Sequence, residues 1–138
     1  MKYLRHLLAH KWRMLFQGLP LWLALAHDWD KLWPDEFGPY SRAFGRKGKY
    51  DKGPDFFFAW HKHQRRSKHH WQVWVVIDDD GRLVPLPIPD LYRREMLADW
   101  ITAAAARGST AQAWYRAHWD DLKLHPDTRA WVESELKI

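Results

Sequence analysis

Residues 21–31 read LWLALAHDWDK, an apolar helical run that ends in two adjacent residues of metal-ligating type, His27 and Asp28. An isolated His near the start, a later cluster of His residues and a later Asp complete the chain order H…HD…H…HH…D. Because His and Asp side chains together can bind one or two divalent ions, this order predicts a metal site. Lys31, one helical turn after Asp28, would stand beside the site with a fixed positive charge.

Length and composition narrow the class of protein. The chain has 138 residues, enough for one domain with a single core, so we expect one domain over residues 1–138. It contains no cysteine, which excludes thiolate metal sites and fits a cytoplasmic protein. The longest apolar run is too short to cross a bilayer, so we expect no membrane partner.

The net charge indicates the kind of partner, and the aromatic content indicates which side chains fill the core. The net charge of +5 favours phosphate-bearing partners. Eleven tryptophans are unusual for this length, and most of them stand in segments that look helical and half-buried. We expect most of these side chains in the core: Trp12, Trp22, Trp60, Trp71, Trp100, Trp114 and Trp131.

Apolar spacing, prolines at helix starts and glycines after helix ends predict a mainly helical chain. The expected helices cover residues 2–17, about 20–33, 34–44, 55–66, 90–107 and about 110–123, with a last helix that starts at 125–127. Residues 68–75 predict another short helix or a continuation of the one before it. Residues 73–77 and 82–86 predict one peripheral β-hairpin. The fold class is therefore all-α, a compact bundle of about six to seven helices with one small hairpin. Residues 45–54, rich in glycine and basic residues, predict a loop that could cover a substrate.

Four polar residues stand in apolar surroundings on three of the expected helices: His10, His27, Asp28 and Asp99. A buried, ionised carboxylate without a partner is strongly unfavourable, and a divalent cation is one way to compensate it. Glu95 lies one turn before Asp99 on the same helix face, where it could orient a ligand or act as a base.

The His cluster at residues 61–70 supplies further candidate ligands. His63 and His70 are seven positions apart, so they share a face of a continuous helix, or both reach one cavity if the chain turns at Ser67. We favour this pair over His61 and His69. Four Lys and Arg residues interrupt the cluster, so a solvated basic stretch is the competing interpretation.

These residues resemble the HD-domain superfamily of metal-dependent phosphohydrolases, because His27-Asp-Trp-Asp-Lys31 matches its HD-x-x-K element. The chain is also similar to a small HD-like family of phage and bacterial genomes. The patterns of that family are HD-x-S-K-F, E-F-x-P-Y, H-x-x-R-N-x-H-H-W and E-M-x-x-D-W, and they correspond here to residues 27–32, 36–40, 63–71 and 95–100. The departures are Asp30 for Ser, Leu32 for Phe and Ser67 for Asn, and none removes an expected ligand.

The resemblance implies that residues 1–138 form a single HD-like metal-binding domain with an all-α HD fold. It also implies a ligand set. His10, His27, Asp28 and Asp99 would bind a first ion, and Asp28 would bridge to a second ion held by His63 and His70. The Gly-Tyr-Pro signature of one branch is absent, so its cyclic-dinucleotide specificity does not carry over.

The expected function is hydrolysis of a nucleotide or another phosphoester by a metal-activated water, with manganese, iron, nickel or zinc as the ion. Lys31 would stabilise charge on the phosphoryl group, and Glu36 or Glu95 would accept a proton or orient a ligand. Arg42, Lys47 and Lys49 would contact the substrate, or are ordinary surface charges.

Two alternatives use the same residues differently. An HD-fold di-iron oxygenase would employ the same His and Asp ligands. A non-catalytic nucleotide-binding or nucleic-acid-binding protein would use the basic stretch of residues 46–68 with Phe56, Phe57, Phe58 and Trp71 for stacking, although these aromatics also have the spacing of a helix core.

Overall fold

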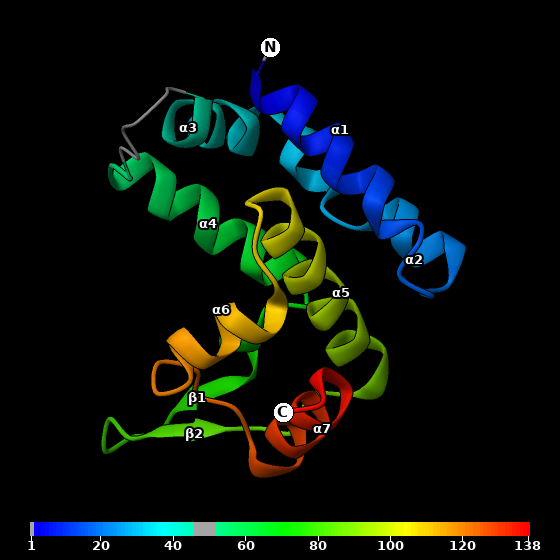
Figure 1. Ribbon diagram of the computed structural model, residues 1–138. Coiled ribbons are helices and arrows are strands. Elements are labelled where there is room, and N and C mark those ends of the chain that lie inside the picture. Colours follow the sequence, from blue (N-terminus) through cyan, green and yellow to red (C-terminus); the bar gives the residue numbers. More distant parts are fainter. Residues whose placement is uncertain (1, 46–51) are drawn as a thin grey trace. The chain divides into compact units, whose positions relative to one another are not determined.

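A computed structural model describes residues 2–45 and 52–138 of the chain (Figure 1). In this described part there are seven α-helices and one two-stranded antiparallel sheet, which confirms the all-α class with a small hairpin. The chain divides into two compact units, Met1–Ser67 and Lys68–Ile138, and each is described by itself. That the whole chain is one domain stays a prediction.

The first unit contains four α-helices: α1 (Lys2–Met14), α2 (Leu21–Ala26), α3 (Pro34–Gly45) and α4 (Pro54–Arg66). α3 and α4 pack against each other, and α1 packs against α3. Helix α3 begins with Pro34 followed by Asp35 and Glu36, and α4 begins with Pro54 followed by Asp55, which places acidic side chains at both helix N-termini. The small apolar core of this unit consists of Tyr3, Tyr40, Ala43, Phe56 and Ala59.

The prediction of a single helix over residues 20–33 is wrong, because the helix is interrupted at His27 and Asp28. α2 ends at Ala26, Asp28 has the left-handed backbone conformation with φ of 53°, and a short 3-10 helix follows at Trp29–Leu32. The Lys11 ammonium donates a hydrogen bond of 2.9 Å to the His27 carbonyl oxygen, which a continuing helix would use itself. Asp tolerates the left-handed conformation better than most residues. His27 and Asp28 therefore sit at a corner and not on a helix.

The second unit contains the hairpin and three α-helices: β1 (Val75–Ile77), β2 (Leu83–Pro85), α5 (Asp90–Ala106), α6 (Ala111–His118) and α7 (Pro126–Leu136). Val76 pairs with Val84 at the centre of the hairpin. Helix α6 is shorter than expected, and its N-terminal cap is Thr110, whose hydroxyl accepts a hydrogen bond from the Ala113 amide. The core of this unit is larger and apolar: Ile88, Met96, Leu97, Ala111, Tyr115, Leu122, Leu124, Val132 and Leu136.

The tryptophans divide between core and surface. Trp71, Trp100, Trp114 and Trp131 pack against the core of the second unit, and Trp60 packs against that of the first, as expected. Trp12 and Trp22 are instead 63% and 61% exposed, which corrects the expectation for both. None of the described helices is both long enough and apolar enough to cross a membrane.

Candidate metal centre

Three imidazoles and one carboxylate gather in the interior of the first unit: those of His10, His27, His63 and Asp28, all buried. α1 carries His10 in the buried row that also contains Leu7 and Met14. The corner after α2 supplies His27 and Asp28, and α4 supplies His63 near its C-terminal end. The first unit carries four of the six residues that were expected to bind metal, and these four gather in its interior.

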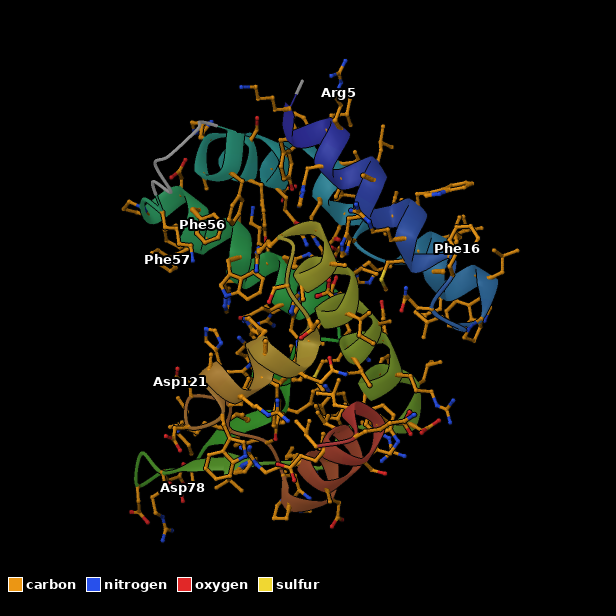
Figure 2. The ribbon with its side chains drawn as sticks, viewed as in Figure 1. Arg5, Phe16, Phe56, Phe57, Asp78 and Asp121 are labelled. Carbon is orange, nitrogen blue, oxygen red and sulfur yellow. The ribbon has the colours of Figure 1, made fainter. Side chains whose placement is uncertain are left out.

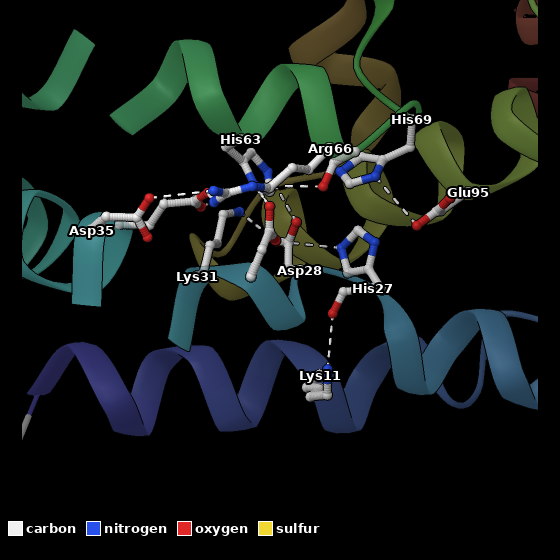
Figure 3. Close-up of polar contacts among 12 residues, drawn as sticks. Lys11, His27, Asp28, Lys31, Asp35, His63, Arg66, His69 and Glu95 are labelled. Carbon is white, nitrogen blue, oxygen red and sulfur yellow. Dashed lines mark hydrogen bonds and ion pairs between the residues drawn. The ribbon is translucent and has the colours of Figure 1, made fainter. Parts of the chain in front are cut away.

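The ligand atoms of His27, Asp28 and His63 face one another (Figure 3). His27 Nε2 lies 3.5 Å from one Asp28 oxygen, and it lies 3.2 Å from His10 Nε2. One ligand atom from each of His10, His27 and Asp28 lies within 4.8 Å of those of the other two. In a tetrahedral site with metal–nitrogen distances of about 2.0–2.1 Å, two ring nitrogens are about 3.3 Å apart. The donor set therefore fits a divalent ion bound by nitrogen and oxygen.

His63 is held from both sides of its ring. Its Nε2 lies 3.1 Å from Asp28 Oδ1, while its Nδ1 lies 2.9 Å from Asp30 Oδ2 and 3.4 Å from Glu36 Oε2. A His that ligates a metal commonly donates its second ring N–H to a carboxylate, which fixes the ring orientation. Asp30 is thus a residue of the centre that the sequence analysis missed. The available signal was its place two residues after Asp28, within the stretch His27-Asp-Trp-Asp-Lys31.

The centre combines three buried carboxylates with three cationic groups. Lys31 pairs with Asp28, and Arg66 donates a hydrogen bond of 2.6 Å to Glu36. Burial raises the pKa of Asp28, but the charges of His27, Lys31 and His63 outweigh burial and hold it well below its ordinary value. Burial lowers the pKa of His63, yet the Asp28 charge and the hydrogen bonds to Asp28 and Asp30 raise it to about 10. The interior therefore keeps the Asp28 carboxylate ionised.

Tyrosine hydroxyls line the same acidic interior. Burial, followed by the charges of Asp28 and Glu36, raises the pKa of both Tyr3 and Tyr40. Among residues 2–45 and 52–138, neither hydroxyl has a hydrogen-bond partner, and the same holds for the buried Oδ1 of Asp30. Buried polar atoms in this state are usually satisfied by water or an ion, so they too are consistent with a hydrated metal centre.

The two catalytic candidates of the first unit have different surroundings. Lys31 extends from the corner, and its ammonium reaches Asp28 and lies over the Tyr40 ring at 5.6 Å. Glu36 is fully buried between Arg66 and His63. This geometry favours the orienting role of Glu36 over the role of a proton acceptor.

The second unit carries its own buried pair of candidates. His69 Nδ1 lies 3.2 Å from Glu95 Oε1, and both side chains are buried. His70, which the sequence analysis preferred to His69, is only partly buried and has its ring centroid 4.2 Å from that of His69. Asp99 follows Glu95 by one turn on α5 and is partly buried. The assignments of His70 and Asp99 as ligands stay predictions.

Of the three expected substrate contacts, Arg42 lies within the described residues. Arg42 is exposed, and its guanidinium pairs with Asp55, with Nε 3.2 Å from Oδ2. This pairing lowers the pKa of Asp55 and compensates the Arg42 charge. Lys47, Lys49 and most of the loop expected to cover a substrate lie outside the described residues.

Comparison with known proteins yields one family. No match to a curated protein or to a solved structure was found. A family model described as a family of unknown function (DUF5662) matches residues 1–138. The chain therefore belongs to the DUF5662 family.

Proposed function

We propose that this protein is a metal-dependent phosphohydrolase that acts on a nucleotide or another small phosphoester. The observation that carries the proposal is the buried cluster of His10, His27, Asp28 and His63, with the Lys31 ammonium at its edge. Such a cluster costs stability unless something compensates it, and nitrogen and oxygen donors at this spacing suit a divalent ion.

Each residue of the cluster has a separate task in this proposal. His10, His27 and Asp28 would hold the ion, and Asp30 would keep the His63 ring oriented through Nδ1. When bound, a divalent ion lowers the pKa of a coordinated water and neutralises phosphate oxygens. Lys31 would donate a hydrogen bond to a phosphate oxygen. Its side chain is more exposed than that of Asp28, with which it pairs.

The full ligand set includes two residues that rest on the sequence alone. The resemblance to HD-domain proteins adds Asp99 to the ligands of the first ion and assigns His63 and His70 to a second ion. Imidazole and carboxylate ligands suit manganese, iron, nickel and zinc alike, so the ligands do not select the metal.

The test is metal analysis of protein purified without a His-tag, followed by a screen of nucleotides and phosphoesters with manganese added. We expect His27→Ala to lose the metal and the hydrolysis. Lys31→Ala should keep the metal and lose hydrolysis, because an ammonium serves the substrate and not the ion. His61→Ala, exposed on the same helix as His63, is the matched control and should behave like wild type.

Three outcomes would overturn the proposal. Wild-type protein that binds no metal after a divalent ion has been added would contradict the proposed metal site. Equal metal loss in Lys31→Ala and His27→Ala would make Lys31 part of the scaffold. A coloured iron-loaded protein that consumes oxygen and hydrolyses none of the phosphoesters would assign the centre to the oxygenase alternative.

A further inference from the structure

Exposed apolar side chains form a regular row along α1. The exposed fractions of Leu4, Leu8, Trp12 and Phe16 increase along the chain from 38% to 69%. Phe16 follows just beyond the end of α1, with its ring centroid 5.4 Å from that of Trp12. Leu4, Leu8 and Trp12 recur every four residues within the helix. Residues at this spacing lie on one side of a helix. α1 buries a different side, which carries Tyr3, Leu7, His10 and Met14. This apolar row therefore does not belong to the core of the first unit.

The next helix, α2, also carries exposed apolar side chains. Helix α2 contacts α1, and Leu21, Trp22 and Leu25 on α2 are each more than half exposed. Large exposed apolar patches are rare on monomeric soluble proteins and usually mark an interaction surface. We call the row on α1 together with these three residues the apolar face.

Positive charge accompanies the apolar face. Residues 1–27 contain four Lys and Arg residues and no Asp or Glu. Arg5 directly follows Leu4 and Arg13 directly follows Trp12, so each arginine lies about 100° further around the helix than its apolar neighbour. Both arginines are exposed, and Figure 2 shows Arg5 near the N-terminal end of α1 and Phe16 just beyond its C-terminal end. The exposed part of α1 is thus apolar on one side and basic on the next.

We propose that α1 binds the surface of an anionic lipid bilayer, with the apolar row in the boundary between headgroups and acyl chains. Trp, Phe and Leu beside Arg and Lys are the side chains of helices that lie in this boundary. A second copy of the chain fits the face less well, because residues 1–27 offer no acidic group to meet the arginines of the other copy. An anionic bilayer supplies both the apolar layer and the opposite charge.

This inference is compatible with the finding that no described helix can cross a membrane. The sequence-based expectation of no membrane partner rested on the length of the apolar runs, which governs spanning and not surface binding. The deciding information is the exposure of Trp12 and Trp22, which the sequence analysis placed in the core.

The experiment is co-sedimentation of the full chain with vesicles of phosphatidylcholine alone or with added phosphatidylglycerol. We expect binding only to the vesicles with phosphatidylglycerol, weakened by salt. The double variant Leu8→Gln/Trp12→Gln should lose binding at least tenfold. Arg5→Gln/Arg13→Gln should lose about 25-fold at low salt, about fivefold for each charge removed. Trp119→Gln, which alters an exposed tryptophan of the second unit, is the matched control and should bind like wild type.

Companion measurements make each outcome decisive. Circular dichroism and thermal melts show whether the variants fold, and the metal content of each variant is expected to equal that of wild type. The proposal is independent of phosphohydrolase activity, so failure of either leaves the other standing. Absence of vesicle binding overturns it, as does binding that depends on the arginines but not on Leu8 and Trp12. A dimer in light scattering that Leu8→Gln/Trp12→Gln abolishes, without vesicle binding, would assign the face to a second copy.

Discussion

The interiors of the two units differ in what fills them. The first unit contains a small apolar core and three buried carboxylates, those of Asp28, Asp30 and Glu36. His63 contacts all three carboxylates. The second unit has a larger apolar core of nine buried residues with one buried His–carboxylate pair, His69 and Glu95. Stability in the second unit therefore comes mainly from apolar burial, whereas stability in the first depends on charge compensation.

This contrast indicates which unit depends on a bound ion for its stability. Buried carboxylates are tolerated only while cations face them, so a change in one partner leaves the others uncompensated. An apolar core has no such requirement, and its substitutions act through lost contacts and cavities. Metal binding, pH and charge substitutions should therefore act on the first unit, and volume substitutions on the second.

The largest effect should follow from Asp28→Asn. The substitution removes the carboxylate that interacts with His27, Lys31 and His63 at once. We expect loss of bound metal and a decrease in the free energy of unfolding of about 3–5 kcal/mol, as for removal of one partner of a buried ion pair. Metal analysis and urea unfolding measure both, with exposed Asp121→Asn as the control. Retained metal in Asp28→Asn would show that Asp28 is not a ligand.

Stability of the metal-stripped protein should decrease as the pH rises. The folded pKa of His63 is about 10, above its ordinary value of 6.5, so its contribution is complete below pH 6.5 and lost as the pH rises through 10. The slope between these values is up to about 1.4 kcal/mol per pH unit. Urea unfolding of wild type and His63→Gln across this range isolates the contribution, with His61→Gln as the matched control. Parallel curves for wild type and His63→Gln would contradict it.

Much of the fold followed from the sequence, and the exceptions have physical causes. Apolar spacing and the Pro and Gly positions predicted the helices at residues 34–44, 55–66 and 90–107 to within a few residues. The break at His27 and Asp28 was missed because it accompanies a contact from Lys11, which is distant in the chain. Local pattern carries no information about such a contact.

The candidate site shows the same division. His10, His27, Asp28 and His63 were predicted from residue type and order, and contacts between neighbouring members link them in the first unit. Asp30 was missed because only the 3-10 turn after the break directs it toward His63. Trp12 was placed wrongly because α1 has two apolar sides, one with Leu7 and one with Leu8, and spacing alone does not tell which side packs.

Leu122→Ala should test the apolar side of the comparison. Leu122 is buried in the core of the second unit and offers no metal ligand. We expect a loss of about 2–5 kcal/mol in the free energy of unfolding from the cavity, with unchanged metal content. Leu83→Ala, on the exposed face of β2, is the control and should stay within about 0.5 kcal/mol of wild type. Metal loss in Leu122→Ala would show that the second unit's core also governs the centre.

The smallest effect should come from Asp30→Asn, which tests whether His63 needs a charged partner. Asn keeps nearly the same volume and can still accept a hydrogen bond from Nδ1, but it lacks the negative charge that makes the ring a stronger ligand. We expect metal affinity, measured by competition with a coloured chelator, to fall about 10- to 100-fold while the protein stays folded. Asp30→Ser, which replaces the carboxylate by a shorter hydroxyl, should lie between wild type and Asp30→Asn if a water replaces the missing oxygen. Asp55→Asn, which removes a surface carboxylate of the same unit, should leave the affinity unchanged. Wild-type affinity in Asp30→Asn would mean that burial alone holds the His63 ring. Of the carboxylates on either side of that ring, only Asp28 would then matter through its charge.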